Sequence, residues 1–290
     1  MSWHRCVLAF IFACLIAGVR APGGRAQQSA PAASGARILL LPRRIVSGER
    51  ATLAVLDVNG RLTPGVTVNF SNRDRLTTDA TGRALFVAPL NPGVIYGSIA
   101  GRAGRVATAI LAPGEAASTS IEVSSAPQFA SLTDRFELFG KSFCGDADAN
   151  EVTIAGQPAL VLASSPIALV VLPSPGLHPG SATVGVSCGK RQSPPFSITF
   201  AGLELEADSS PLKPGEHRTL TVHVRGTAAR IAFVARNLAP DIAELTGGHS
   251  VRASSSGGAE NLAKFEVVGQ RSGSFLISIR LLPSLRSPLS

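Results

Sequence analysis

From about residue 37 onward, apolar and polar side chains alternate in short runs along the chain. In residues 218–224, Leu220, Val222 and Val224 share one face and polar side chains share the other. A period of two is typical of a β-strand with one face in a core and one face in water. Runs with this pattern or with strand composition occur at residues 51–57, 66–70, 84–87, 95–100, 105–111, 136–143, 203–207, 230–235, 264–268 and 275–281. The pattern therefore predicts an all-β fold.

Glycine and proline separate these runs, for example at Asn59-Gly60, Pro64-Gly65 and Gly247-Gly248. Glycine tolerates a positive φ and proline presets φ, so such pairs favour tight turns. The 29 glycines and 20 prolines also leave no room for a heptad repeat, which excludes a coiled coil. A hydrophobic content of 45% excludes wholesale disorder. Short strands joined by tight turns are expected to pack as sandwiches.

The N-terminal segment has the features of a signal peptide. An apolar run of 14 residues, Cys6–Val19, is followed by small residues that place cleavage after Ala26. Two alternatives remain open, an uncleaved anchor and a lipoprotein modified at Cys14. No stretch, this run included, reaches the ~18 apolar residues of a membrane span, so the mature chain is expected to have none. Residues 1–26 are thus predicted to be a signal peptide, and residues 27–36 a flexible linker.

The first expected domain, residues 37–113, carries a recurrent order of strands and turns. Residues 55–60 read Val-Leu-Asp-Val-Asn-Gly, residues 64–68 Pro-Gly-Val-Thr-Val, and residues 77–84 Thr-Thr-Asp-Ala-Thr-Gly-Arg-Ala. This order resembles bacterial Ig-like domains of the invasin and intimin type, with carboxypeptidase-regulatory-like domains close behind. The shared features are turn chemistry, so the resemblance implies a sandwich and no catalytic site.

The second expected domain, residues 117–201, resembles the IPT/TIG family. The resemblance rests on a strand at 136–143 ending in a Gly turn, on residues 150–159, on a Pro-rich crossing at 172–179 and on residues 180–186. It implies another Ig-like sandwich.

Residues 202–290 have the alternation and turn spacing of a third Ig-like sandwich. The whole chain is then expected to be three consecutive Ig-like β-sandwich domains after a signal peptide, since three sandwiches of ~100 residues fit its length.

Two of the four cysteines lie in the mature region, Cys144 and Cys188. An even pair in an exported chain indicates a disulfide, and these two sit at the ends of strands that could be neighbours. The alternative is a pair of buried free thiols.

Asp146-Ala147-Asp148-Ala149-Asn150 resembles the opening of a calcium loop, in which alternating carboxylates reach one hard cation. Glu151 and Gln157 stand where an EF-hand needs Gly and Glu, so an EF-hand is excluded. A looser calcium site with Asp146, Asp148 and Glu151 as ligands remains a hypothesis. The alternative is a solvated polar turn, and no other cofactor is expected.

Positive charge is concentrated in residues 37–113, which hold ten arginines and four acids, a net +6. Residues 114–201 carry a net −3 and residues 202–290 a net +2. The arginines expected to bind an anionic cell-surface polymer or an acidic partner are Arg73, Arg75, Arg102 and Arg105. The alternative is an ordinary charged surface. Nucleic acid is not an expected partner, because the mature charge is modest and no RNA-binding aromatic signature is present.

Catalytic motifs are missing from the sequence. It contains neither His-Glu-x-x-His nor Gly-x-Ser-x-Gly, and Gly140-Lys141-Ser142 lacks the earlier glycine of a phosphate loop. Outside the signal segment Tyr96 is the only Tyr or Trp, which disfavours sugar stacking.

The sequence therefore predicts a non-enzymatic secreted, periplasmic or cell-surface protein that acts in adhesion or protein–protein interaction. The alternative is an accessory subunit that binds a polysaccharide or a calcium-dependent ligand.

Overall fold

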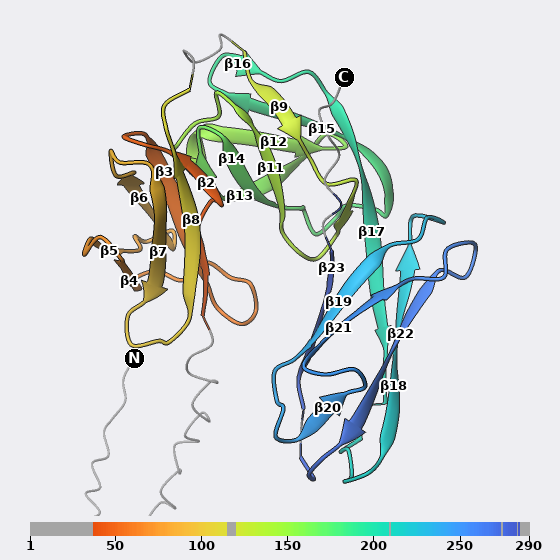
Figure 1. Cartoon of the computed structure of the whole chain (residues 1–290). Coiled ribbons are helices and arrows are strands. Elements are labelled where there is room, and N and C mark those ends of the chain that lie inside the picture. Colours follow the sequence, from red (N-terminus) through yellow and green to blue (C-terminus); the bar gives the residue numbers. More distant parts are fainter. Residues whose placement is uncertain (1–36, 115–119, 209, 274, 283, 285–290) are drawn as a thin grey trace, which may run out of the picture. The chain divides into compact units, whose positions relative to one another are not determined.

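The computed structural model describes residues 37–114, 120–208, 210–273, 275–282 and 284. The described chain is all-β, with strands β1 to β23 and a single turn of 3-10 helix, η1 (Ala147–Ala149) (Figure 1). No helix among these residues is long and apolar enough to cross a membrane. The signal peptide and linker expected at residues 1–36 lie outside the described residues.

The first sandwich consists of two sheets that enclose one hydrophobic cluster. Its strands are β1 (Ile38–Leu40), β2 (Arg44–Val46), β3 (Arg50–Leu56), β4 (Thr67–Phe70), β5 (Arg75–Thr77), β6 (Arg83–Val87), β7 (Gly93–Ile99) and β8 (Arg105–Leu111). β3 pairs with β1 and β6, and the other five form a sheet of order β2-β8-β7-β4-β5, with β2 parallel to β8. Val68, Phe70, Ile95 and Ile99 point from this five-stranded sheet into the core, because alternate residues of a strand face opposite sides.

The second sandwich is built around Phe136 and Phe200, whose rings meet edge to face with centroids 5.7 Å apart. Its strands are β9 (Glu122–Ser125), β10 (Phe129–Ser131), β11 (Phe136–Lys141), β12 (Asn150–Ile154), β13 (Gln157–Ser165), β14 (Ala168–Leu172), β15 (Gly180–Cys188), β16 (Arg191–Gln192) and β17 (Phe196–Glu206). β13 pairs with β12 through its first residues and with β14 along its later ones, so it belongs to both sheets.

The third sandwich begins within β17, the long strand that runs from the green to the blue part of the ribbon in Figure 1. β17 pairs with β15 up to Phe200 and with β18 from Gly202 onward. The domain boundary expected at residue 202 therefore falls inside one continuous strand.

Two sheets complete the third sandwich around the buried ring of Phe233. Its further strands are β18 (His217–Arg225), β19 (Ala232–Asn237), β20 (Ala243–Leu245), β21 (Ser250–Ser254), β22 (Leu262–Gly269) and β23 (Ile277–Leu281). One sheet has the order β20-β22-β18-β17, and the other has the order β21-β19-β23.

Contacts between the first and second sandwiches are buried and partly polar. The Arg83 side chain is 8% exposed and donates to the carbonyls of Val161 (2.7 Å) and Leu162 (3.3 Å) and to the Asp148 carboxylate (2.9 Å). A fourth hydrophobic cluster joins Ala54 and Leu56 of β3 to Leu162 and Val170 of the second sandwich. Both faces of β3 are consequently buried.

Candidate functional site

The outer face of the five-stranded sheet aligns polar side chains from four strands. In register across the sheet, Arg105 of β8 lies opposite Ser98 of β7, Ser98 opposite Asn69 of β4, and Asn69 opposite Arg75 of β5. Neighbouring strands are about 4.8 Å apart, so the two arginine Cα atoms lie about 14 Å from each other. Two of the four arginines expected to bind an anionic partner thus lie at the two ends of this row, and the hydroxyl of Ser98 and the amide of Asn69 lie between them.

Contacts within this face hold the two guanidinium groups in place. Arg75 Nε donates to Asn69 Oδ1 at 3.0 Å, and Ser98 Oγ donates to the Asn69 carbonyl at 3.4 Å. The Arg105 guanidinium lies over the Tyr96 ring, 4.6 Å from its centroid, in a cation–π arrangement. The row is therefore partly ordered before any ligand arrives.

Apolar side chains share the same face along β7 and β8. Val94, Tyr96 and Leu111 are 56%, 39% and 41% exposed, and Ala107 lies directly opposite Tyr96. We call this surface the β7 face; it comprises Asn69, Arg75, Val94, Tyr96, Ser98, Arg105, Ala107 and Leu111. It combines cationic, aromatic and aliphatic groups on one exposed sheet.

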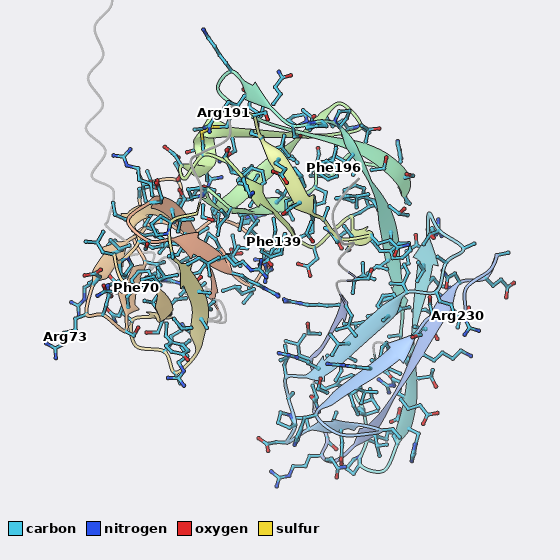
Figure 2. All side chains as sticks on the ribbon, turned by 45° about the horizontal axis from the view of Figure 1, so that its top comes forward. Phe70, Arg73, Phe139, Arg191, Phe196 and Arg230 are labelled. Carbon is cyan, nitrogen blue, oxygen red and sulfur yellow. A yellow bond between two sulfur atoms is a disulfide. The ribbon has the colours of Figure 1, made fainter. Side chains whose placement is uncertain are left out.

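The other two expected arginines lie in turns at opposite ends of this sheet. The Arg73 amide bonds to the Phe70 carbonyl in the β4–β5 turn, and the Arg102 amide bonds to the Ile99 carbonyl in the β7–β8 turn. β4 and β7 are antiparallel, so these turns are at opposite ends. Figure 2 shows Arg73 projecting outward, while Phe70 points into the core. The expected patch of four arginines is therefore not assembled, and only Arg75 and Arg105 share a surface.

A cavity of about 240 Å³ opens between the edge strands β5 and β6. Its apolar lining includes Phe70 and Phe86, whose ring centroids are 5.3 Å apart. Its polar lining is Asn72, Asp74 and Arg75, and Asn72 Nδ2 donates to Asp74 Oδ2 at 2.6 Å. The lining contains no Ser, Cys or His to act as nucleophile or base.

The carboxylates expected to bind calcium each have a separate partner. Asp146 caps η1 by accepting from the Asp148 amide (3.1 Å), Asp148 pairs with Arg83, and Glu151 accepts from Ser187 Oγ (3.3 Å). Within the described ranges, no three His, Cys, Asp or Glu side chains are grouped to hold a metal ion. The hypothesised ligand set is not assembled among the described residues, where the three carboxylates instead take part in a capping bond, an ion pair and a cross-strand bond.

Cys144 and Cys188 are joined by a disulfide, with Cα atoms 5.8 Å apart. It links the loop after β11 to the end of β15, and Arg191 of β16 donates to Cys188 Sγ at 3.0 Å. Asn150 Nδ2 also bonds the carbonyls of Cys144 and Asp146, both at 2.8 Å. The disulfide and this amide together fix the loop that contacts Arg83.

Glu137 of β11 is a carboxylate in a partly buried position, and burial disfavours its charged form. Burial raises its pKa, and the nearby arginines, Arg43 first, oppose that shift. Arg43 Nε lies 3.0 Å from Glu137 Oε2. Glu137 therefore takes part in an ion pair between the first two sandwiches and does not face the cavity.

Sequence reasoning missed Asn69 and Ser98, the residues that connect the two arginines. Alternation along the strands places each of them on a solvent face, but their alignment depends on pairing between strands distant in sequence. That register has no local signal.

No family model matches the chain, and no curated protein matches it. Among solved structures, the chain is similar to a Bacteroides ovatus protein of a mixed-linkage glucan utilization locus, solved in complex with a mixed-linkage heptasaccharide (14% identity, 82% of this chain, TM-score 0.35). It is also similar to domains 1–6 of the surface layer protein SbsC (13%, 88% of this chain, 0.20) and to an auxiliary nutrient binding protein from Bacteroides thetaiotaomicron (13%, 49% of this chain, 0.24). The chain spans 73% of the first of these structures and 39% of each of the other two.

Proposed function

We propose that this chain is a non-enzymatic exported binding protein that acts in adhesion or protein–protein interaction. Its docking surface is the β7 face, and its partner is a protein surface that presents carboxylates around an apolar centre. The resemblances of residues 37–113 to invasin-type domains and of residues 117–201 to IPT/TIG domains belong to the same proposal. So does the location, secreted, periplasmic or at the cell surface.

The observation that carries the proposal is the composition of the β7 face. Tyrosine and arginine are among the residues enriched in protein–protein interfaces and among those that contribute most to the binding energy there. Tyr96 lies among exposed aliphatic side chains, and Arg105 stacks on it while Arg75 ends the row about 14 Å away. An apolar centre with cations at its rim fits a protein with acidic residues better than it fits a sugar chain.

The cavity between β5 and β6 also favours binding over catalysis. Six of its nine lining residues are apolar, and its single carboxylate, Asp74, is already bonded to Asn72. An active site needs several polar groups that converge on the reacting atoms. A cavity of this composition can instead accept an apolar side chain of a partner.

Crosslinking in the native cells, followed by purification of the chain and mass spectrometry, tests the proposal. A face variant would carry Tyr96→Ala, Arg75→Gln and Arg105→Gln. A control variant would carry His223→Ala, Arg225→Gln and Lys264→Gln, which lie on the outer face of another sheet. We expect one or two proteins to be captured by the wild type and the control and lost by the face variant.

Two results would contradict the proposal. One is that every captured protein is retained by the face variant. The other is that the chain co-purifies with glycan alone, which would support the alternative of an accessory polysaccharide binder.

A further inference from the structure

The outer face of the β21-β19-β23 sheet carries three exposed arginines. Arg252 of β21 and Arg280 of β23 both lie opposite Val234 of β19, and Arg236 follows two residues along β19. Phe233 and Ala235 point the other way, into the core. Strand alternation therefore directs all three guanidinium groups to the same surface.

The spacing of these arginines is fixed by the sheet. Arg252 and Arg280 are two strand spacings apart, about 10 Å between Cα atoms, and Arg236 is about 8 Å from each. Ser250 and Ser278 lie opposite Arg236 on its two sides. We call this surface the β19 face; it comprises Val234, Arg236, Ser250, Arg252, Ser278 and Arg280.

The outer face of the other sheet of the same sandwich carries acidic as well as basic side chains. On the outer face of β17 and β18, Arg225 pairs with Glu204 at 2.7 Å and His223 contacts Glu206 at 2.9 Å. The strands of the β19 face contain no acidic residue. One outer face thus mixes both signs of charge, and the other presents only cations.

A carboxylate contacts the β19 face at its margin. Asp134 Oδ2 lies 3.8 Å from Arg280 Nε, and Asp134 Oδ1 lies 3.4 Å from Arg135 Nη1. One acid shared between two arginines leaves the face with a clear excess of positive charge. Like charges about 8–10 Å apart on one surface repel each other, so an anion that bridged them would be favoured.

We propose that the β19 face binds a linear polymer of phosphate groups. A guanidinium donates five hydrogen bonds and accepts none, and the side-chain acceptors among the residues of this face are the hydroxyls of Ser250 and Ser278. A sugar chain brings many hydroxyl donors, which need more acceptors than these two hydroxyls provide. A phosphate chain brings acceptor oxygens and negative charge, and it matches the fork of arginine. This inference is independent of the protein partner proposed for the β7 face, because different residues on a different sheet carry it.

The test is a titration of the full chain with fluorescently labelled inorganic polyphosphate at several salt concentrations. For the wild type, three phosphate contacts on a flexible chain predict that log K falls with log salt with a slope of about −2. We expect each of Arg236→Gln, Arg252→Gln and Arg280→Gln to weaken binding about fivefold, and the triple variant about a hundredfold with most of the slope lost.

A matched control removes three cations from elsewhere on the third sandwich: Lys213→Gln, Arg225→Gln and Lys264→Gln. These side chains are exposed, as are the three arginines of the face, so each triple variant should fold as the wild type does. We expect the control to bind within twofold of the wild type. Two further variants leave the arginines in place: Ser250→Glu, which adds an acid to the face, should weaken binding, and Asp134→Asn should strengthen it about twofold.

Three results would overturn the inference. The first is that the face variant still binds within twofold of the wild type. The second is that the control loses as much affinity as the face variant, which would indicate a general charge effect. The third is that polyglutamate of equal length binds as tightly as polyphosphate, which would make the ligand an acidic peptide.

Discussion

The β7 face and the β19 face both carry exposed arginines, and they differ in what surrounds those arginines. On the β7 face, Arg105 lies over Tyr96 beside the exposed Val94. On the β19 face, serines and one half-buried valine, Val234, separate the arginines. A guanidinium beside an aromatic and aliphatic surface is part of a mixed contact that excludes water. A guanidinium among hydroxyls remains a solvated charge.

This difference shows why counts of arginine alone do not identify a partner. The first domain range has a net charge of +6 and the third a net charge of +2, yet the β19 face of the third carries three arginines and the β7 face of the first carries two. Net charge averages over faces that pair their charges and faces that do not. The partner is recognised by the composition of a single face.

Loss of the disulfide should give the largest effect, a loss of stability in the second sandwich, and should leave the difference between the β7 face and the β19 face unchanged. Cys144→Ser with Cys188→Ser opens a link across a sequence separation of 44. Chain entropy predicts a loss of about 4 kcal/mol in the free energy of unfolding of the second sandwich. Urea unfolding with and without reductant measures it. Polyphosphate binding should not change at urea concentrations at which the third sandwich remains folded. If it fell there, the β19 face would depend on the second sandwich for binding.

Tyr96→Ala should give the next largest effect, and only on one face. Truncation of a central interface tyrosine costs about 2 kcal/mol, or roughly thirtyfold in the affinity of the protein partner. Polyphosphate binding should stay within twofold, since Tyr96 lies on the β7 face. Surface plasmon resonance with each ligand in turn separates the two outcomes. Equal losses for both ligands would mean that the two faces do not act separately.

The third largest effect we expect is a difference between the two faces in how strongly salt weakens ligand binding. Between 50 mM and 200 mM salt, a slope of about −2 predicts that polyphosphate binding weakens roughly sixteenfold. Binding of the protein partner should weaken less, because apolar contact at Tyr96 and Val94 is not screened. Parallel titrations at the two salt concentrations check this. A steeper salt dependence for the protein partner would reverse the assignment of the two faces.

The smallest expected effect concerns stability at low salt and compares the two outer faces of the third sandwich. Arg252→Gln relieves repulsion and should raise the free energy of unfolding by at most about 0.5 kcal/mol. Arg225→Gln breaks the pair with Glu204 and should lower it by a similar amount. Thermal unfolding at low and high salt measures both, and the difference should vanish at high salt. Two shifts of the same sign would contradict the contrast between paired and unpaired faces.

Alternation in the sequence was a good guide where one face of a strand meets water. It located β7, β8 and β18 to within a residue or two, and strand composition located β3, whose two faces are both buried. It gave no signal for β14, Ala168–Leu172, because this strand is apolar throughout and almost fully buried. Val170 packs in the cluster shared with the first sandwich, so no solvent-facing period exists there.

The candidate sites were harder to predict, because they depend on pairing at long range. Arg75 and Arg105 stood out by charge, but their common row arises only through the pairing of β4 with β5 and β7, and of β7 with β8. The spacing of the carboxylates in the acidic loop allowed two interpretations, a calcium site and a solvated polar turn. Nothing nearby in the sequence shows that Arg83, 65 residues away from Asp148, pairs with that loop.

Site-specific photo-crosslinking in the native cells tests the central claim most directly. A crosslinking residue would replace Ala107, in the middle of the β7 face, or Ser250, on the β19 face; both positions are exposed. We expect position 107 to give a protein adduct of one defined mass, which Tyr96→Ala abolishes and which position 250 does not give. If position 107 captured no protein, or if both positions gave the same adduct, the β7 face would not be the docking surface for a protein.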